Sequence, residues 1–295
     1  MKKYFKISLS ILIIFIFVCN IFAESFDGFI CDVETTGWTY LSACCHMGKA
    51  TTTYKFETEE AEEQYGSLVS SAFDLWDSAG INCSYSASST EGTIEIVQGL
   101  EYNGLSGADS LDSSGHVLTW TIQLSKSYLD DATKANTVKM KTIAHELGHV
   151  YGLGHVDNKY QIMYGVEFAF KEVKPADRVG MQVVSHIHSH TSDYSKTYEA
   201  INSTQHKAIC STCLMYKIEN CSKFFVNKNS TQHEVKCSYC SLSTLENCSY
   251  TSIHSGNTHY AYFNCMCGNT EIMSWPCSGN PCIEPYSIQP EYETE

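Results

Sequence analysis

Basic residues are scarce in this sequence. Its 295 residues include 19 lysines and arginines against 33 aspartates and glutamates, which gives a formal net charge of −14 at pH 7. Proteins that bind nucleic acid or anionic lipid usually present clustered positive charge to the phosphates. The scarcity of such charge argues against both classes of partner, and we expect no nucleic acid to bind.

Long apolar runs are also lacking, except at the N-terminus. Three lysines within the first six residues precede an apolar run from Ile7 to Val18, and Ala23 offers a small residue for cleavage. The run is shorter than the about 20 residues that a membrane-spanning helix needs. The pattern is typical of a secretory signal peptide. We expect residues 1–23 to be this signal, a secreted chain beginning at Glu24, and membrane attachment only through an uncleaved signal.

Cysteine is abundant, with fifteen residues. Without Cys19 in the signal, an even number stands in each half of the chain, and many cysteines are typical of proteins exported to oxidising surroundings. The sequence therefore predicts disulfides in two separately bridged parts, although it does not give their pairing. The first part holds Cys31, Cys44, Cys45 and Cys83, and the other ten cysteines begin at Cys210.

A histidine-rich motif in the middle of the chain predicts a metal site. If Thr137–Tyr151 is helical, His145 and His149 lie one turn apart on one face. Gly152 accepts the left-handed backbone that ends a helix, and the turn brings back His155 as a third ligand. Three neutral imidazoles leave one position of a tetrahedral zinc ion for water, which is the arrangement of catalytic zinc sites. Glu146 is then placed to take a proton from that water.

This stretch resembles the signature of the metzincin zinc peptidases. Met163, eight residues after His155, resembles their Met-turn, and the short interval is similar to the matrixins. The resemblance extends over roughly Tyr54–Val184. It implies an α+β zincin domain with a mixed twisted sheet, an active-site helix, a Met-turn and a C-terminal helix. It also implies a zinc endopeptidase that hydrolyses peptide bonds of a protein or peptide through a zinc-activated water, with Glu146 as general base.

The flanking sequence predicts the other elements of such a domain. Alternation predicts strands at Tyr54–Phe56, Thr93–Val97 and His116–Leu124, and an apolar stripe predicts a helix at Glu59–Ala79. A last helix is expected to open at Pro175. Residues 99–114 are rich in Gly, Ser and Asp and are expected to be loop, with a short edge strand at 105–108 that pairs with an extended substrate. Residues 164–170 are expected to line an apolar pocket.

Matrixins also hold a structural zinc and calcium ions, and the same region of this chain offers few ligands for them. His46 and His116 are the only histidines before the motif, so a structural zinc of the matrixin kind is not expected. Asp109 and Asp112 are candidates for calcium, with solvated loop carboxylates as the favoured interpretation. The chain also lacks the Pro-Arg-Cys-Gly motif of matrixin zymogens. Local disulfides are therefore favoured over a thiolate of Cys31, Cys44 or Cys45 that blocks the zinc.

The C-terminal part is repetitive. The segment Asn202–His206 recurs 27 residues later as Asn229–His233, and the cysteines that follow each copy keep the same interval. Such repetition predicts tandem small modules. Export favours disulfides between these cysteines, whereas the His-x-x-x-Cys-x-x-Cys spacing keeps structural zinc as an alternative. The corresponding cysteines are Cys210, Cys213 and Cys221, then Cys237, Cys240 and Cys248, and a degraded third copy holds His259, Cys265, Cys267 and Cys277.

The sequence thus predicts a peptidase domain at 24–187, a linker at 188–205 and Cys/His-rich repeats at 206–295. For the alternating His186, His188 and His190, metal binding is the alternative to the favoured polar linker. We expect the repeats to bind a cell-surface or other extracellular ligand. The alternative is a secreted adhesin, or another glycan- or protein-binding protein, whose zinc domain is an inactive scaffold. The intact Glu146 argues against that alternative, because an inactive enzyme often loses its general base.

Overall fold

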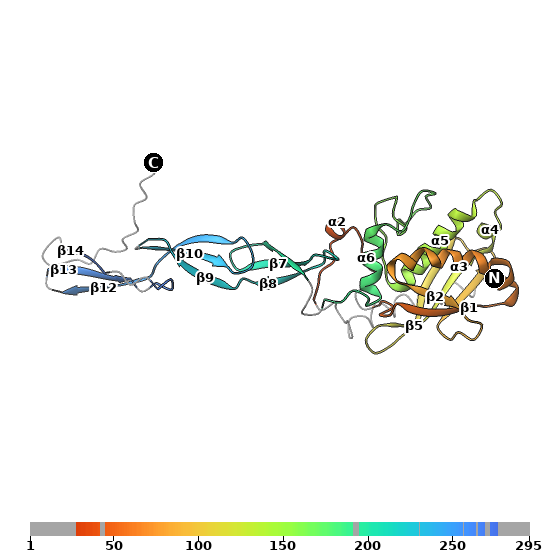
Figure 1. The fold of residues 1–295 in the computed structure, drawn as a ribbon, viewed down its shortest axis with the longest axis horizontal. Helices are drawn as coiled ribbons and strands as arrows, with labels where there is room; N and C mark the ends of the chain where they lie inside the picture. Colours follow the sequence, from red (N-terminus) through yellow and green to blue (C-terminus); the bar gives the residue numbers. More distant parts are fainter. Residues whose placement is uncertain are drawn as a thin grey trace. The chain divides into compact units, whose positions relative to one another are not determined.

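The computed structural model describes residues 28–41, 45–190, 195–229, 231–255, 257–263, 265–268 and 272–276. The predicted signal peptide and Cys44 lie outside these residues. The chain divides into two compact units (Figure 1). The first comprises Met1–Thr197 and Ile209–Lys217, and the second comprises Tyr198–Ala208 and Ile218–Glu295. Within the described ranges, every helix is too short or too polar to span a bilayer.

A five-stranded mixed sheet forms the centre of the first unit. Its strands are in the order β2-β1-β3-β5-β4. The first four run parallel to their neighbours, and β4 runs antiparallel to β5 at the edge of the sheet. The strands are β1 (Thr51–Phe56), β2 (Asn82–Tyr85), β3 (Gly92–Val97), β4 (Gly104–Leu111) and β5 (Val117–Ser125).

The first long helix, α3 (Glu59–Phe73), begins where the sequence predicts it. The Thr58 hydroxyl caps it by accepting a hydrogen bond from the amide of Ala61, and three glutamates occupy its first turn. The helix ends earlier than predicted, because Asp74–Ala79 forms a separate 3₁₀ helix, η1. This tighter segment buries Trp76 fully, and the indole N–H donates to the carbonyl of Ala144 at 2.9 Å.

The second long helix, α5 (Asn136–Tyr151), carries the histidine motif. It contacts α3, β4 and β5, so that both helices lie against the strands of the sheet (Figure 1). The closing helix α6 (Pro175–Val184) begins at the predicted proline, and the Asp177 carboxylate accepts the amide N–H of Lys174 at 2.9 Å. Two short helices, α2 (Val33–Thr36) and α4 (Lys126–Leu129), complete this unit.

The sheet has more strand structure than the sequence predicts, at β2 and at β4. The strand β2 has no clear alternation and was not predicted. The stretch expected to be mostly loop contains β4, which is eight residues long and includes the predicted edge segment 105–108. Small and polar side chains hide this strand in the sequence, because its backbone pairing with β5 defines it rather than an apolar face.

Beyond α6 the described residues form three small sheets of three strands each, and the last two sheets along the chain lie in the second unit. In β7 and β10, which occupy equivalent repeat positions, every second side chain is buried and the first of these is a histidine. The strands are β6 (Lys196–Ala200), β7 (Gln205–Cys210), β8 (Tyr216–Asn220), β9 (Lys223–Asn227), β10 (Gln232–Cys237), β11 (Ser243–Asn247), β12 (Tyr250–Ser255), β13 (Thr258–Phe263) and β14 (Ile272–Pro276).

The predicted disulfides are corrected by this structure. Cys31 and Cys83 are free thiols, and so are the eight described cysteines from Cys210 to Cys267. The sulfur atoms of Cys221 and Cys240, for example, are 3.9 Å apart, whereas a disulfide bond is about 2.05 Å long. An even number of cysteines was therefore not a sufficient signal for pairing.

Candidate metal centre and active site

The end of α5 brings the three motif histidines together. His145 and His149 are one turn apart, and Gly152 ends the helix with φ of +108°. A β-carbon at Gly152 would lie 3.0 Å from the carbonyl oxygen of Cys45. Glycine therefore meets both the conformational and the steric demand at the point where the chain turns toward His155.

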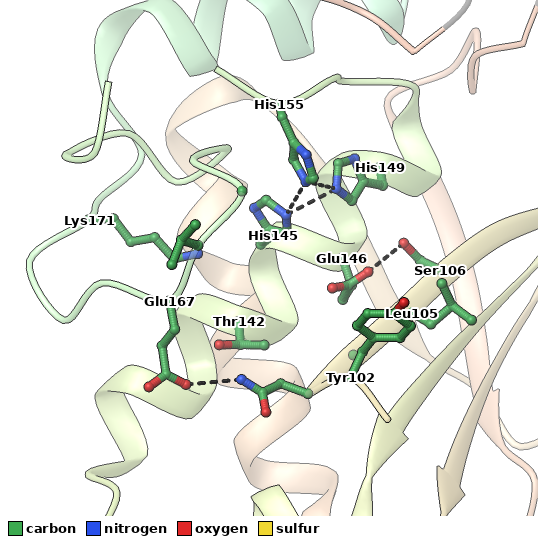
Figure 2. A pocket seen from close by; sticks show the side chains of 14 residues that line it. Tyr102, Leu105, Ser106, Thr142, His145, Glu146, His149, His155, Glu167 and Lys171 are labelled. Atoms are coloured by element: carbon green, nitrogen blue, oxygen red, sulfur yellow. Dashed lines mark hydrogen bonds between the residues drawn. The ribbon is translucent and has the colours of Figure 1, made fainter. Parts of the chain in front are cut away.

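The three imidazoles face one point with the same ring atom (Figure 2). Their Nε2 atoms are 3.0 Å apart for His145 and His149, 3.0 Å for His149 and His155, and 3.1 Å for His145 and His155. Two nitrogens bound tetrahedrally to one zinc ion would be about 3.3 Å apart, given Zn–N bonds of about 2.0–2.1 Å. The donor set therefore fits a single zinc ion with three protein ligands.

The other ring nitrogens fix the tautomers of two ligands. Nδ1 of His145 lies 2.8 Å from the carbonyl oxygen of Ile162, and Nδ1 of His149 lies 2.8 Å from that of Leu153. A carbonyl only accepts, so each Nδ1 donates and each Nε2 keeps its lone pair for a metal. Burial lowers the pKa of His145 to about 2 and that of His149 to about 4, so both rings are neutral at physiological pH.

Glu146 is held between the histidines and the edge strand. It is buried, and the Ser106 hydroxyl on β4 donates to its Oε2 at 2.7 Å (Figure 2). A β-carbon at Gly104 would lie 2.7 Å from Cγ of Glu146, so the strand approaches this close only because residue 104 is glycine. Burial raises the pKa of Glu146, against the opposing effects of the Ser106 hydrogen bond and the Lys171 charge. A carboxylate with a raised pKa is a stronger base than one in water.

Two charged residues of the site escaped the sequence analysis. Lys171 is only 3% exposed, and burial lowers its pKa to about 8. Its ammonium donates to the carbonyl of Tyr164 at 3.4 Å. Glu167 forms an ion pair with Lys134 and accepts a hydrogen bond from the Asn103 amide at 3.2 Å. No motif marks these residues, and the only signal was their place in and just after the predicted pocket segment.

The pocket in front of the histidines is more polar than predicted. Segment 164–170 contributes Gly165, Val166 and Glu167, with Lys171 beyond it, whereas Phe168 and Phe170 are not among the lining residues. Phe170 is 70% exposed. The opposite wall is β4 and the residues before it. The lining residues outside the histidines, Glu146 and this segment are Tyr102, Asn103, Gly104, Leu105, Ser106 and Thr142.

Met163 lies beneath the active-site helix. It is 1% exposed, and a β-carbon on Gly148 would lie only 2.3 Å from its sulfur. The carbonyl of Met163 accepts the amide N–H of Val156 at 3.1 Å, which ties the turn to the residue after His155. The methionine thus packs as an apolar support beneath the helix that carries His145 and His149.

A second histidine group was not foreseen. His46, His116 and His186 come together, with Nε2 of His46 and His186 2.9 Å apart. Sequence reasoning missed it because its members are far apart in the chain. Nearby, the Asp112 carboxylate is 3.2 Å from Nδ1 of His116, and that of Asp109 accepts from the Thr121 hydroxyl at 2.7 Å. These contacts give both carboxylates a structural role, and calcium binding there stays a prediction.

None of the described cysteines lies where its thiolate could occupy the open position of the zinc site. Cys31, Cys45 and Cys83 do not line the pocket. Burial raises the pKa of the Cys31 thiol to about 11, which disfavours the thiolate that a zinc-blocking switch requires. The Cys31 thiol instead donates to the carbonyl of Trp38 at 3.3 Å.

Comparison with known proteins agrees with this site. Residues 46–184 match the family model of peptidase family M10, described as matrixin. The three-histidine site and the family match resemble the metzincin zinc metallopeptidases at the level of the family. Within this class, residues 46–184 are a matrixin-like domain, and the family implies protein or peptide substrates.

Two solved structures are also similar to the chain, at low identity. The GM1-bound form of the ECX AB5 holotoxin is 14% identical with a TM-score of 0.35, covering 54% of this chain and 85% of its own. Metalloproteinase-II from Bacteroides fragilis is 12% identical with a TM-score of 0.30, covering 53% of this chain and 65% of its own. No curated protein matches the sequence.

Proposed function

We propose that the chain is a secreted zinc-dependent endopeptidase with Glu146 as general base. The observation that carries the proposal is the convergence of three Nε2 atoms, 3.0–3.1 Å apart, next to a buried carboxylate. The N-terminal lysines and apolar run support export.

The residues of the site have separate roles in peptide hydrolysis. Zinc, when bound by His145, His149 and His155, supplies a Lewis acid for the peptide carbonyl. Glu146 accepts the proton of the attacking water and delivers it to the nitrogen of the leaving amine. The Ser106 hydroxyl holds one carboxylate oxygen, so the other is available for the proton. Carbonyls of Ile162 and Leu153 keep two of the imidazoles in the required tautomer.

The edge strand gives the site a means of holding an extended chain. In the described sheet β4 has a neighbour on one side only, which is β5. A peptide in β conformation can pair with the outer side of β4, and its scissile bond would then lie in front of Glu146. Leu105, 48% exposed, presents an apolar surface on this strand to a substrate side chain. This geometry favours cleavage within chains that are locally extended or unfolded.

The test is hydrolysis of an unfolded protein by the chain from Glu24 onward. We expect cleavage that a zinc chelator abolishes, and a loss of about 10²–10⁴-fold in kcat/KM for Glu146→Ala. The matched control is Glu63→Ala, which removes an exposed carboxylate of α3 and should leave the rate unchanged. Zinc content is measured for each variant.

Full zinc content without cleavage in the unaltered chain would contradict the proposal. It would favour the alternative in which the repeats bind a ligand and the zinc domain is a scaffold.

A further inference from the structure

We propose that the chain binds three structural zinc ions between His188 and Cys267, each held by the cysteine pair of one repeat and by residues that precede that repeat. The ligands form three clusters, each with four donor atoms within 4.8 Å of one another. The first cluster is His188, His190, Cys210 and Cys213; the second is His206, Cys221, Cys237 and Cys240; the third is His233, Cys248, Cys265 and Cys267. Cys₂His₂ and Cys₃His are the ligand sets of structural zinc sites.

The distances in the second cluster are those of a zinc tetrahedron. Nδ1 of His206 is 3.5 Å from the sulfur of Cys221 and 3.6 Å from that of Cys237, and the sulfurs of Cys221 and Cys240 are 3.9 Å apart. Zn–S and Zn–N bonds of about 2.3 and 2.0–2.1 Å give tetrahedral edges of about 3.6 Å between N and S and about 3.8 Å between sulfurs. A disulfide would bring two sulfurs to about 2.05 Å.

The other two clusters are tighter, and in the third the sulfurs of Cys265 and Cys267 are 2.9 Å apart, still longer than a disulfide bond. In the third, Nδ1 of His233 is 3.6 Å from the sulfur of Cys248 and 2.9 Å from that of Cys265. In the first, whose four members all belong to the first unit, His188 lies 3.3 Å from Cys210 and His190 lies 2.9 Å from Cys213, each through Nε2. All three clusters therefore bring a histidine nitrogen within 2.9–3.6 Å of a cysteine sulfur.

Two of the histidines also have repeated partners at the ring nitrogen that faces away from the cluster. His206 and His233 turn Nδ1 inward, and their Nε2 atoms lie 3.7 and 3.8 Å from the carboxylates of Glu219 and Glu246. Metal-binding histidines usually donate the second ring N–H to a carboxylate, a backbone carbonyl or water, and these two carboxylates lie just beyond hydrogen-bond distance of the buried Nε2 atoms. An aromatic ring also meets each imidazole edge to face, Tyr198 at His206 and Phe225 at His233, with centroids 5.1 Å apart. These partners recur at the 27-residue interval.

The interior of the second unit consists mainly of these ligands. Among its described residues, only Ala208 and Val235 are buried aliphatic side chains. The other buried side chains there are His206, His233, His259, Cys237, Cys240, Cys248 and Cys265. A three-stranded sheet with so little apolar surface needs a metal or covalent bonds to be stable. Since the described cysteines of this unit are free thiols, bound metal is the remaining source of stability for these sheets.

Zinc binding at these clusters displaces protons from the cysteine thiols and oxidises no sulfur. Each thiol that ligates zinc gives up its proton to solvent, two at the first cluster and three at each of the others, and no sulfur–sulfur bond forms. The Tyr239 amide N–H, 3.5 Å from the sulfur of Cys237, stabilises one of the resulting thiolates.

The test compares zinc per chain in the full-length protein and its variants after dialysis against metal-free buffer. Cys237→Ser should remove one zinc ion per chain, because it takes one ligand from the second cluster alone. Cys83→Ser is the control, since Cys83 is a free thiol outside all the clusters, and it should keep the full content. Cleavage of unfolded substrate serves as a separate readout and should survive both changes, so failure here is distinguishable from failure of the peptidase.

A second variant guards against misfolding of the first. Cys240→His exchanges a thiolate for an imidazole and should keep the zinc. After substitution by Co²⁺, it should weaken the thiolate-to-metal absorption bands relative to the unaltered chain. Unchanged zinc in Cys237→Ser, iron in place of zinc, or an unreduced mass lower by two hydrogens for each pair of repeat cysteines would each overturn the proposal.

Discussion

Single atoms decide the geometry around Glu146. The carboxylate lies where α5 meets β4, and the contact is close because residue 104 has no side chain. The hydroxyl of Ser106 then fixes one oxygen at 2.7 Å. Positions 104 and 106 belong to a stretch that the sequence marked only as a glycine- and serine-rich loop with a short edge strand. Their contribution to the site depends on a contact that no sequence pattern encodes.

Gly104→Ala should therefore reduce activity although it adds only one methyl group. Its β-carbon would lie 2.7 Å from Cγ of Glu146 and must displace that side chain. Misplacing a reacting group by about 1 Å costs about 10²-fold in rate. We expect a fall in kcat of that order at unchanged zinc content. Gly107→Ala, on the same strand with nothing within 4 Å of its β-carbon, should be close to neutral, and equal losses in the two variants would refute the explanation.

At the scale of helices and strands, side-chain periodicity predicted the elements whose apolar faces mark them in the sequence. The motif helix, the start of α3, the strand cores of β3 and β5 and the proline at the start of α6 agree with the prediction, because the apolar stripes and alternation that mark them are local. The strand β2, most of β4 and the second histidine group were missed, because backbone pairing and long-range contacts form them. His188 and His190 were assigned to a linker for the same reason, since their cysteine partners come 20 or more residues later.

The connection before β3 is stabilised by one carboxylate. Glu91 accepts hydrogen bonds from Lys49, the amide of Thr53 and the Thr53 hydroxyl. Burial alone would raise its pKa, but these bonds outweigh burial and lower the pKa from 4.5 to about 2. Because the folded-state pKa is the lower one, the stabilisation is complete above pH 4.5 and is lost as the pH falls through about 2.

Glu91→Gln should accordingly lower the free energy of unfolding at pH 7 by about 1–2 kcal/mol, a value reduced by solvent screening of a partly exposed group. It should also flatten the loss of stability between about pH 4.5 and 2. Urea titrations across that range measure both effects, with Glu101→Gln, at an exposed carboxylate, as the comparison. A loss at pH 7 that persists unchanged at pH 2 would argue against this role.

At the scale of the whole molecule, the two units differ in the interactions that stabilise each of them. The first has a sheet, two long helices and a large buried cluster that includes Trp38, Trp76 and Trp120. The second has sheets of three strands around histidines and cysteines. The first should therefore keep its fold without metal, because apolar burial supplies its stability, and the second should depend on metal.

Chelation followed by hydrogen exchange of the full chain tests this difference. We expect amide protection in β9–β11 to fall by several orders of magnitude, while protection in β1, β3 and β5 persists. Returning zinc should restore the first group of amides. Equal protection of β9–β11 with and without chelator would show that the second unit is stable without metal.

The sharing of ligands between neighbouring repeats has a consequence for biosynthesis. Each cluster is completed by the second cysteine of a pair, and these residues, Cys213, Cys240 and Cys267, follow one another at intervals of 27 residues. Every other ligand of a cluster has already been synthesised when that cysteine emerges. As the chain leaves the ribosome, the clusters can therefore close one after another from the N-terminal side, and none has to wait for the C-terminus.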